Sequence, residues 1–124
     1  MARIIIADDD PLICHIVTGI LEQEGHIVGC LPDGLTVAQV VEAKRPHLLI
    51  LDCSMPGKSG LEALREVRAS SLGPSFPVLV LTGRTSRSDE AIAYEAGASD
   101  YLRKPVDPDE LVIRTEALLE KAAA

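Results

Sequence analysis

Short apolar runs alternate with segments of helical periodicity along the whole chain. Strands are predicted at residues 3–7, 26–30, 47–52, 78–82 and 100–103, where branched and aliphatic residues cluster between turn-forming residues. The runs at 47–52 and 78–82 are apolar at nearly every position. This pattern is typical of strands that are buried on both faces of a parallel sheet.

Helices are predicted between these runs. After Pro11, apolar residues recur at helical spacing up to a stop at Gly25, with Asp10 as the N-cap. Further helices are predicted from residue 35 to before Pro46, at residues 60–70, from the end of the polar stretch 83–89 to about Ala96, and from Pro108 onward.

Strands that alternate with helices predict an α/β fold. The expected architecture is a doubly wound, five-stranded parallel sheet with helices on both faces and right-handed crossovers. The common strand order for this number of strands is 2-1-3-4-5. The 124 residues contain no visible linker, so a single domain over residues 1–124 is expected.

Composition and charge narrow the function. The chain is 47% hydrophobic and 25% charged, as ordinary globular proteins are. Its formal net charge of −7 argues against direct binding to a nucleic acid, which needs a surface rich in lysine and arginine. The sequence shows neither a signal-peptide core nor an apolar run of membrane-spanning length, so a cytoplasmic protein without a membrane partner is expected.

The cysteines add little chemistry. Cys14, Cys30 and Cys53 are odd in number and lack the CxxC spacing of metal sites. They indicate reduced, mostly packed thiols rather than a disulfide framework or a zinc site.

Polar residues gather where the strands end. The carboxyl ends of the first, third, fourth and fifth strands meet at one edge of such a sheet, where open α/β folds bind ligands. These ends carry Asp8 and Asp9, then Asp52, Thr82 and Lys104. Clustered carboxylates oppose one another's ionisation, and a divalent cation relieves the repulsion. Oxygen ligands without a nearby cysteine or histidine predict Mg²⁺.

A carboxylate beside Mg²⁺, a lysine and a hydroxyl group is suited to phosphoryl transfer. Asp52 would be the nucleophile, and Lys104 and Thr82 would contact phosphoryl oxygens. Each residue has an ordinary alternative, since Lys104 alone is typical of a surface and the acids near Asp8 alone are typical of a solvated loop. The prediction therefore depends on their convergence.

The segments IIIADDD, LLILDCSMPGKSG, VLVLTG and AGASDYLRKP, in this order, resemble those of response regulator receiver domains across essentially the whole chain. The resemblance implies the flavodoxin-like (βα)5 receiver fold. It also implies that Asp52 accepts a phosphoryl group and that Asp9 and Asp52 ligate Mg²⁺ directly. Asp8 would act mostly through water, and Ser54 would offer its backbone carbonyl.

The resemblance further implies a switch. Thr82 and Lys104 would contact the phosphoryl group, Tyr101 would turn inward as Thr82 moves, and the Lys104–Pro105 peptide bond would be cis. The output surface would lie on the fourth helix, fifth strand and fifth helix. Such a domain is not an enzyme but a phosphoacceptor that assists its own phosphorylation and dephosphorylation.

The resemblance also implies partners. These are a sensor histidine kinase or histidine phosphotransfer protein as phosphodonor, and a downstream output domain or protein. A phosphorylation-dependent homodimer is an assembly suggested by family analogy alone.

Several positions depart from the commonest family pattern. Gly83 stands where alanine is usual, and Val106 stands where an aromatic residue often follows the proline. Arg84 flanks the expected phosphoryl pocket and could contact a phosphoryl oxygen or block an attacking water molecule, so it is expected to affect autodephosphorylation.

Two other functions of α/β proteins lack residues that they need in this sequence. A haloacid-dehalogenase-like phosphatase needs a second acid two residues after its nucleophile, where this chain has Ser54. A flavodoxin-like cofactor binder needs a phosphate-cradling loop after the first strand, where acids would repel phosphate. A pseudo-receiver that acts by protein contact without phosphorylation remains the main alternative.

Overall fold

The computed structural model describes residues 1–55, 57–83 and 87–123. The strands are β1 (Arg3–Ala7), β2 (Ile27–Leu31), β3 (Leu48–Asp52), β4 (Val78–Thr82) and β5 (Asp100–Arg103). The helices are α1 (Pro11–Gln23), α2 (Val37–Lys44), α3 (Gly60–Ala69), α4 (Arg87–Ala96) and α5 (Pro108–Ala123).

The five strands form one parallel sheet in the order β2-β1-β3-β4-β5. Its register places Ala7 opposite Leu51, and Asp52 opposite Leu81. The ends of β1, β3 and β4 therefore lie level with one another. The predicted fold class and strand order are confirmed.

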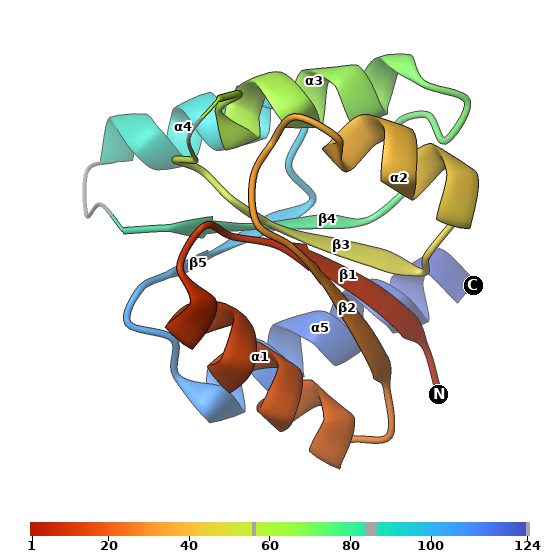
Figure 1. The fold of residues 1–124 in the computed structure, drawn as a ribbon, viewed down its shortest axis with the longest axis vertical. Coiled ribbons are helices and arrows are strands. Elements are labelled where there is room, and N and C mark those ends of the chain that lie inside the picture. The colour runs from red at the N-terminus through yellow and green to blue at the C-terminus, as the bar shows by residue number, and fades with distance from the viewer. Residues whose placement is uncertain (56, 84–86, 124) are drawn as a thin grey trace.

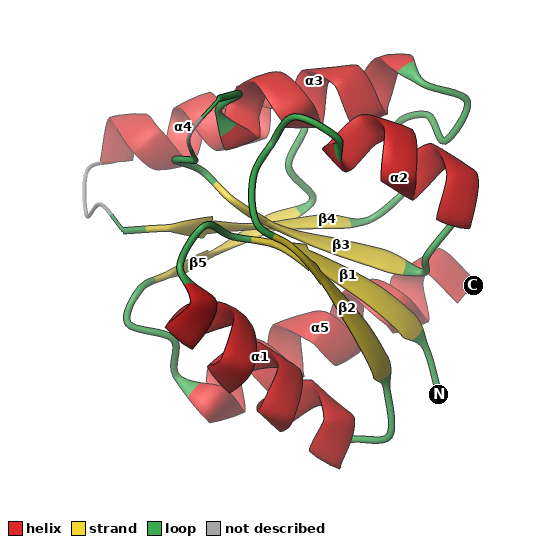
Figure 2. Ribbon diagram, in the orientation of Figure 1, coloured by secondary structure: helices red, strands yellow, loops and turns green. Residues whose placement is uncertain are grey.

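Helices cover both faces of the sheet. Helices α2, α3 and α4 lie on one face, and α1 and α5 lie on the other (Figure 1; Figure 2). Successive residues of β3 point to opposite faces, so Leu49 and Leu51 pack into the core under α2, α3 and α4. Leu48 and Ile50 pack into the core under α1 and α5. The central strand is buried at every position, as its apolar sequence predicts.

Aspartate side chains bind backbone N–H groups near the starts of two helices. The Asp10 carboxylate accepts the backbone N–H of Leu12 at 2.9 Å, which confirms Asp10 as the N-cap of α1. The Asp33 carboxylate accepts the backbone N–H of Leu35 at 2.9 Å. This bond stabilises a turn, so α2 begins at Val37 rather than at residue 35.

The bounds of β2, which is an edge strand, differ from the prediction. The strand runs one residue later than predicted, because Leu31 pairs with Ala7. The three cysteines are free; Cys14 is buried, Cys53 is intermediate, and Cys30, on this edge strand, is the exposed exception to the prediction that they are mostly packed. Burial, with a smaller effect from the neighbouring Cys30, raises the pKa of Cys14 to about 12. The buried thiol is therefore protonated at neutral pH.

Two histidines bind the start of β1. His26 Nδ1 accepts the backbone N–H of Ala2 at 3.0 Å, and His26 Nε2 lies 2.6 Å from Glu116 Oε1 on α5. His47 Nδ1 accepts the backbone N–H of Arg3 at 2.9 Å.

Among the described residues, no helix is both long enough and apolar enough to cross a membrane.

Candidate functional site

The predicted acids meet at the carboxyl edge of the sheet. Asp52 is the last residue of β3, and Asp8 follows the last residue of β1. Both are almost fully buried, whereas Asp9 is exposed. One carboxylate oxygen from each of the three residues lies within 4.8 Å of the others. The sequence prediction that these acids converge is confirmed as geometry.

Lys104 joins this cluster from the segment after β5. Its Nζ atom lies 3.1 Å from Asp8 Oδ2 and 3.2 Å from Asp52 Oδ1. The backbone N–H of Lys104 donates to the Thr82 carbonyl oxygen at 2.8 Å, which fixes the segment against the end of β4. The Lys104–Pro105 bond is cis, as predicted.

The cluster is electrostatically unbalanced. Burial, reinforced by the Asp8 carboxylate, raises the pKa of Asp52, while Lys104 and the backbone N–H of Ser54 partly oppose the rise. Burial by itself would lower the pKa of Lys104, but the two carboxylates outweigh it and raise the pKa. Asp8 and Asp52 thus share one ammonium group, and with the nearby Asp9 carboxylate the cluster keeps a formal charge of −2, which a divalent cation would balance.

The donor set fits Mg²⁺. Asp8 Oδ1 accepts the backbone N–H of Asp10 at 2.9 Å, which aims the side chain. Asp8 Oδ2 is buried and forms the ion pair with Lys104, but within the described chain no donor is aligned to give it a hydrogen bond. A buried oxygen without a hydrogen bond, beside two further carboxylates, is a suitable ligand for a hard divalent cation.

The other predicted site residues take different places. Thr82 ends β4 at the same edge and is buried. Ser54 is exposed, and its backbone N–H interacts with the Asp52 carboxylate. Tyr101, in β5, is half-buried and lies in a separate network of charged and aromatic side chains. Arg84 lies outside the described residues.

Sequence reasoning missed the role of Gly60, the first residue of α3. A Cβ atom at this position would overlap the backbone carbonyl oxygen of Asp52. The backbone N–H of Gly60 also donates to the Cys53 carbonyl oxygen at 3.1 Å. Glycine therefore lets α3 begin directly against the end of β3. The only sequence signal is a glycine placed just after the turn-rich segment.

Comparisons with known proteins agree with this geometry. A family model described as the response regulator receiver domain matches residues 4–116. Over 119 residues the chain is 37% identical to the DNA-binding response regulator MtrA of Mycolicibacterium smegmatis. The match covers 96% of this chain and 51% of MtrA, so the chain spans about half the length of that relative.

Solved structures give the same result. A putative response regulator from Chloroflexus aurantiacus J-10-fl has a TM-score of 0.91 and 33% identity, covering 96% of this chain and 98% of that one. The receiver domain of the sensor histidine kinase PA1611 from Pseudomonas aeruginosa PAO1 has a TM-score of 0.86 and 28% identity, covering 99% and 98% of the two chains. That structure has a magnesium ion coordinated in its active site cleft.

Proposed function

The chain belongs to the response regulator receiver family of two-component systems, and on this premise we propose that it is a phosphorylation-controlled switch whose phosphoacceptor is Asp52. The phosphodonor would be a sensor histidine kinase or a histidine phosphotransfer protein. The domain would not be an enzyme with turnover, but would assist its own phosphorylation and dephosphorylation.

One observation carries the proposal. The Asp52 carboxylate lies at the carboxyl end of the central strand, 3.2 Å from the Lys104 ammonium and beside Asp8 and Asp9. A nucleophile, a cation for a phosphoryl oxygen and ligands for a metal ion therefore occupy one small site. Phosphoryl transfer needs mainly this positioning and charge neutralisation.

The transfer step uses groups of this chain. An Asp52 oxygen attacks the phosphorus atom of a phosphohistidine, the phosphorus–nitrogen bond breaks, and its electron pair stays on the departing imidazole. The product is an acyl phosphate on Asp52. The Lys104 ammonium group then pairs with a phosphoryl oxygen instead of the Asp52 carboxylate. The Thr82 hydroxyl donates a hydrogen bond to another phosphoryl oxygen.

Asp9 and Asp52 would ligate Mg²⁺ directly. Asp8 would act mostly through water, and Ser54 would offer its backbone carbonyl oxygen. When bound, the ion would neutralise charge on the phosphoryl oxygens. The magnesium ion in the similar PA1611 receiver domain supports this assignment. The fold itself fixes the positions of the two buried carboxylates, Asp8 and Asp52, without a bound ion.

The output of the switch would lie elsewhere. Thr82 and Tyr101 would transmit the change to α4, β5 and α5. MtrA is a DNA-binding response regulator about twice as long as the matched region. With a net charge of −7, this chain is poorly suited to contact DNA itself, so we propose that a separate domain or protein carries the output.

Intact-mass spectrometry after incubation with Mg²⁺ and acetyl phosphate tests the proposal. We expect one phosphoryl adduct that requires Mg²⁺, is lost in Asp52→Asn and is retained in Asp109→Asn, a matched change at an exposed acid on α5. An adduct that persists in Asp52→Asn would overturn the assignment of the acceptor. No adduct from either acetyl phosphate or a phosphorylated histidine kinase would instead favour a pseudo-receiver.

A further inference from the structure

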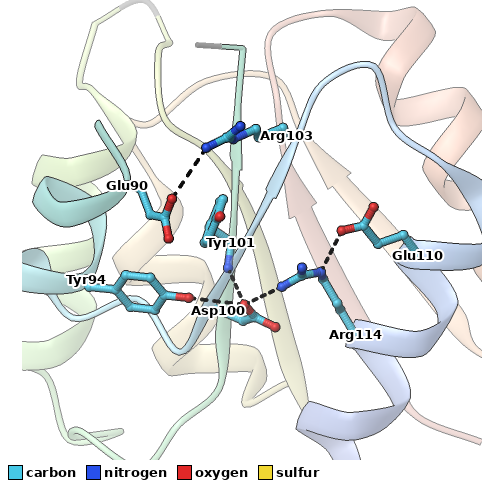
Figure 3. A network of polar contacts seen from close by, with 7 residues as sticks. All are labelled: Glu90, Tyr94, Asp100, Tyr101, Arg103, Glu110 and Arg114. Atoms are coloured by element: carbon cyan, nitrogen blue, oxygen red, sulfur yellow. Dashed lines mark hydrogen bonds and ion pairs between the residues drawn. The ribbon is translucent and has the colours of Figure 1, made fainter. Parts of the chain in front are cut away.

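Tyr101 is enclosed by side chains from three elements (Figure 3). The guanidinium carbon of Arg114, on α5, lies 5.7 Å from the centre of the Tyr101 ring. The guanidinium carbon of Arg103, on β5, lies 5.9 Å from the same centre. The ring of Tyr94, on α4, meets the Tyr101 ring edge to face at a centroid distance of 5.7 Å. We call Tyr94, Arg103 and Arg114 the Tyr101 clamp.

The Arg114 side of the clamp is anchored by Asp100. One oxygen of Asp100 accepts from Arg114 at 2.7 Å, from the Tyr94 hydroxyl at 3.2 Å and from the backbone N–H of Tyr101 at 2.8 Å. Glu110, one turn earlier on α5, accepts a second hydrogen bond from Arg114 at 3.0 Å. Two carboxylates therefore fix the position of the Arg114 guanidinium.

The Arg103 side of the clamp is anchored by Glu90 on α4. The two side chains form an ion pair at 3.5 Å. A hydrogen bond to Glu90 also raises the pKa of the Tyr101 hydroxyl. Both cations near the ring are thus held by acids on α4, β5 and α5, and the observed position of Tyr101 is supported from three directions.

These contacts favour one position of the ring over any other. Cation–π contacts and aromatic edge-to-face contacts each stabilise a ring only at short range. A turn of the Tyr101 ring from this position toward Thr82 would separate it from both guanidinium groups and from the edge of Tyr94. The clamp therefore makes the inward turn less favourable without touching the phosphoacceptor.

We propose that Arg114 is a positioning residue that holds Tyr101 in the observed position and so lowers the affinity of the Asp52 site for a phosphoryl group. The inference rests on the proposed function, because it requires that the inward turn of Tyr101 accompany phosphoryl binding. A ligand's apparent affinity falls with the fraction of molecules in the binding-competent conformation. Weakening the clamp raises that fraction.

The direction of the effect separates this role from simple electrostatics. Loss of a positive charge from the domain by itself weakens the binding of an anion. Loss of the clamp strengthens it. Lys121, in the last turn of α5, provides the matched control, because Lys121→Gln removes the same charge from the same helix without changing the clamp.

The experiment measures binding of beryllofluoride, a phosphoryl mimic, in the presence of Mg²⁺ by fluorine NMR. We expect Arg114→Gln to bind about threefold to tenfold more tightly than the natural chain. We expect Lys121→Gln to bind equally or more weakly. Arg103→Gln, at an exposed residue, removes the other cation and is expected to change affinity in the same direction, so the test stands even if Arg114→Gln folds poorly.

A second background shows whether Arg114 acts through the ring. In Tyr101→Leu there is no aromatic face, so adding Arg114→Gln is expected to leave beryllofluoride affinity unchanged. An equal gain in both backgrounds, or no gain in the natural background, would overturn the role of Arg114. If the natural chain itself does not bind beryllofluoride, it is the proposed function that fails.

Discussion

Gly60 lies so close to Asp52 that a Cβ atom on residue 60 would overlap the Asp52 carbonyl oxygen. The start of α3 and the end of β3 are therefore packed backbone to backbone. Any side chain at position 60 must move one of these elements. The residue in direct contact with such a side chain would be Asp52, the proposed phosphoacceptor.

We expect Gly60→Ala to destabilise the domain by ~2 kcal/mol or more, because backbone atoms cannot yield as a flexible side chain can. Gly19→Ala is the matched control. Gly19 is an exposed position within α1, and its Cβ would meet no described atom within 4 Å. It is expected to stabilise the helix by ~0.5–1 kcal/mol. Urea unfolding of the two variants measures both effects, and equal free energies of unfolding would contradict the packing argument.

Lys104 is expected to have opposite effects on metal binding and phosphorylation. Its ammonium group pairs with Asp8 and Asp52, so it competes with Mg²⁺ for their oxygens. In Lys104→Gln we expect Mg²⁺ to bind about fivefold more tightly by calorimetric titration. Phosphorylation by acetyl phosphate is expected to fall, since a phosphoryl oxygen loses its cation.

Lys121→Gln controls for the change in net charge. The competition would be contradicted if Mg²⁺ affinity in Lys104→Gln were unchanged or weaker.

Asp52→Asn is expected to stabilise the protein at neutral pH by ~1 kcal/mol. Burial raises the pKa of Asp52 in the folded state, so folding favours the protonated carboxyl group. The stability linked to this proton is present below the ordinary value of 3.8 and is lost as pH rises through the folded-state pKa. Ionised Asp52 therefore costs stability at pH 7, and asparagine removes that cost.

Urea unfolding across a pH series tests this expectation. The advantage of Asp52→Asn over the natural chain should shrink as the pH falls toward 3.8. A variant that is less stable than the natural chain at pH 7 would show that the ion pair with Lys104 outweighs the cost of burial.

Two histidines accept hydrogen bonds from backbone N–H groups at the start of β1, one at a buried site and the other at an exposed site. His26 is buried and accepts from Ala2, whereas His47 is exposed and accepts from Arg3. His26→Phe leaves a buried backbone N–H without an acceptor and also removes the contact with Glu116, and we expect a loss of ~1–3 kcal/mol.

His47→Phe is expected to cost less than ~0.5 kcal/mol, because water can replace the lost acceptor. Thermal unfolding compares the two variants. Equal losses in the melting temperature would contradict the expectation that the buried hydrogen bond contributes more to stability than the exposed one.

Much of the fold and the candidate site could be predicted because both depend on local patterns. Strand ends are marked by the change from apolar to polar residues, and parallel strands bring those ends to one edge. This reasoning alone placed Asp8, Asp52 and Lys104 together. The strand order could be predicted because parallel sheets of five strands that alternate with helices commonly have the order 2-1-3-4-5.

What could not be predicted depends on contacts between distant segments. Arg68 lies on α3 and donates hydrogen bonds to the carbonyl oxygens of Gly73, Phe76 and Gly97, which the helical pattern of its segment does not indicate. Cys30 is exposed because its strand is at the edge of the sheet, a position that the predicted strand order already implies. Neither periodicity nor composition records which loops a long side chain can reach.

The Tyr101 clamp also gives this protein a built-in optical probe. The chain contains two tyrosines and no tryptophan. The two tyrosines are Tyr94, which belongs to the clamp, and Tyr101, the ring that the clamp contacts. Near-ultraviolet circular dichroism and intrinsic fluorescence therefore arise almost entirely from the surface formed by α4, β5 and α5. Rearrangement of that surface can be followed in real time on the unlabelled natural chain, with each tyrosine assigned by its own phenylalanine variant.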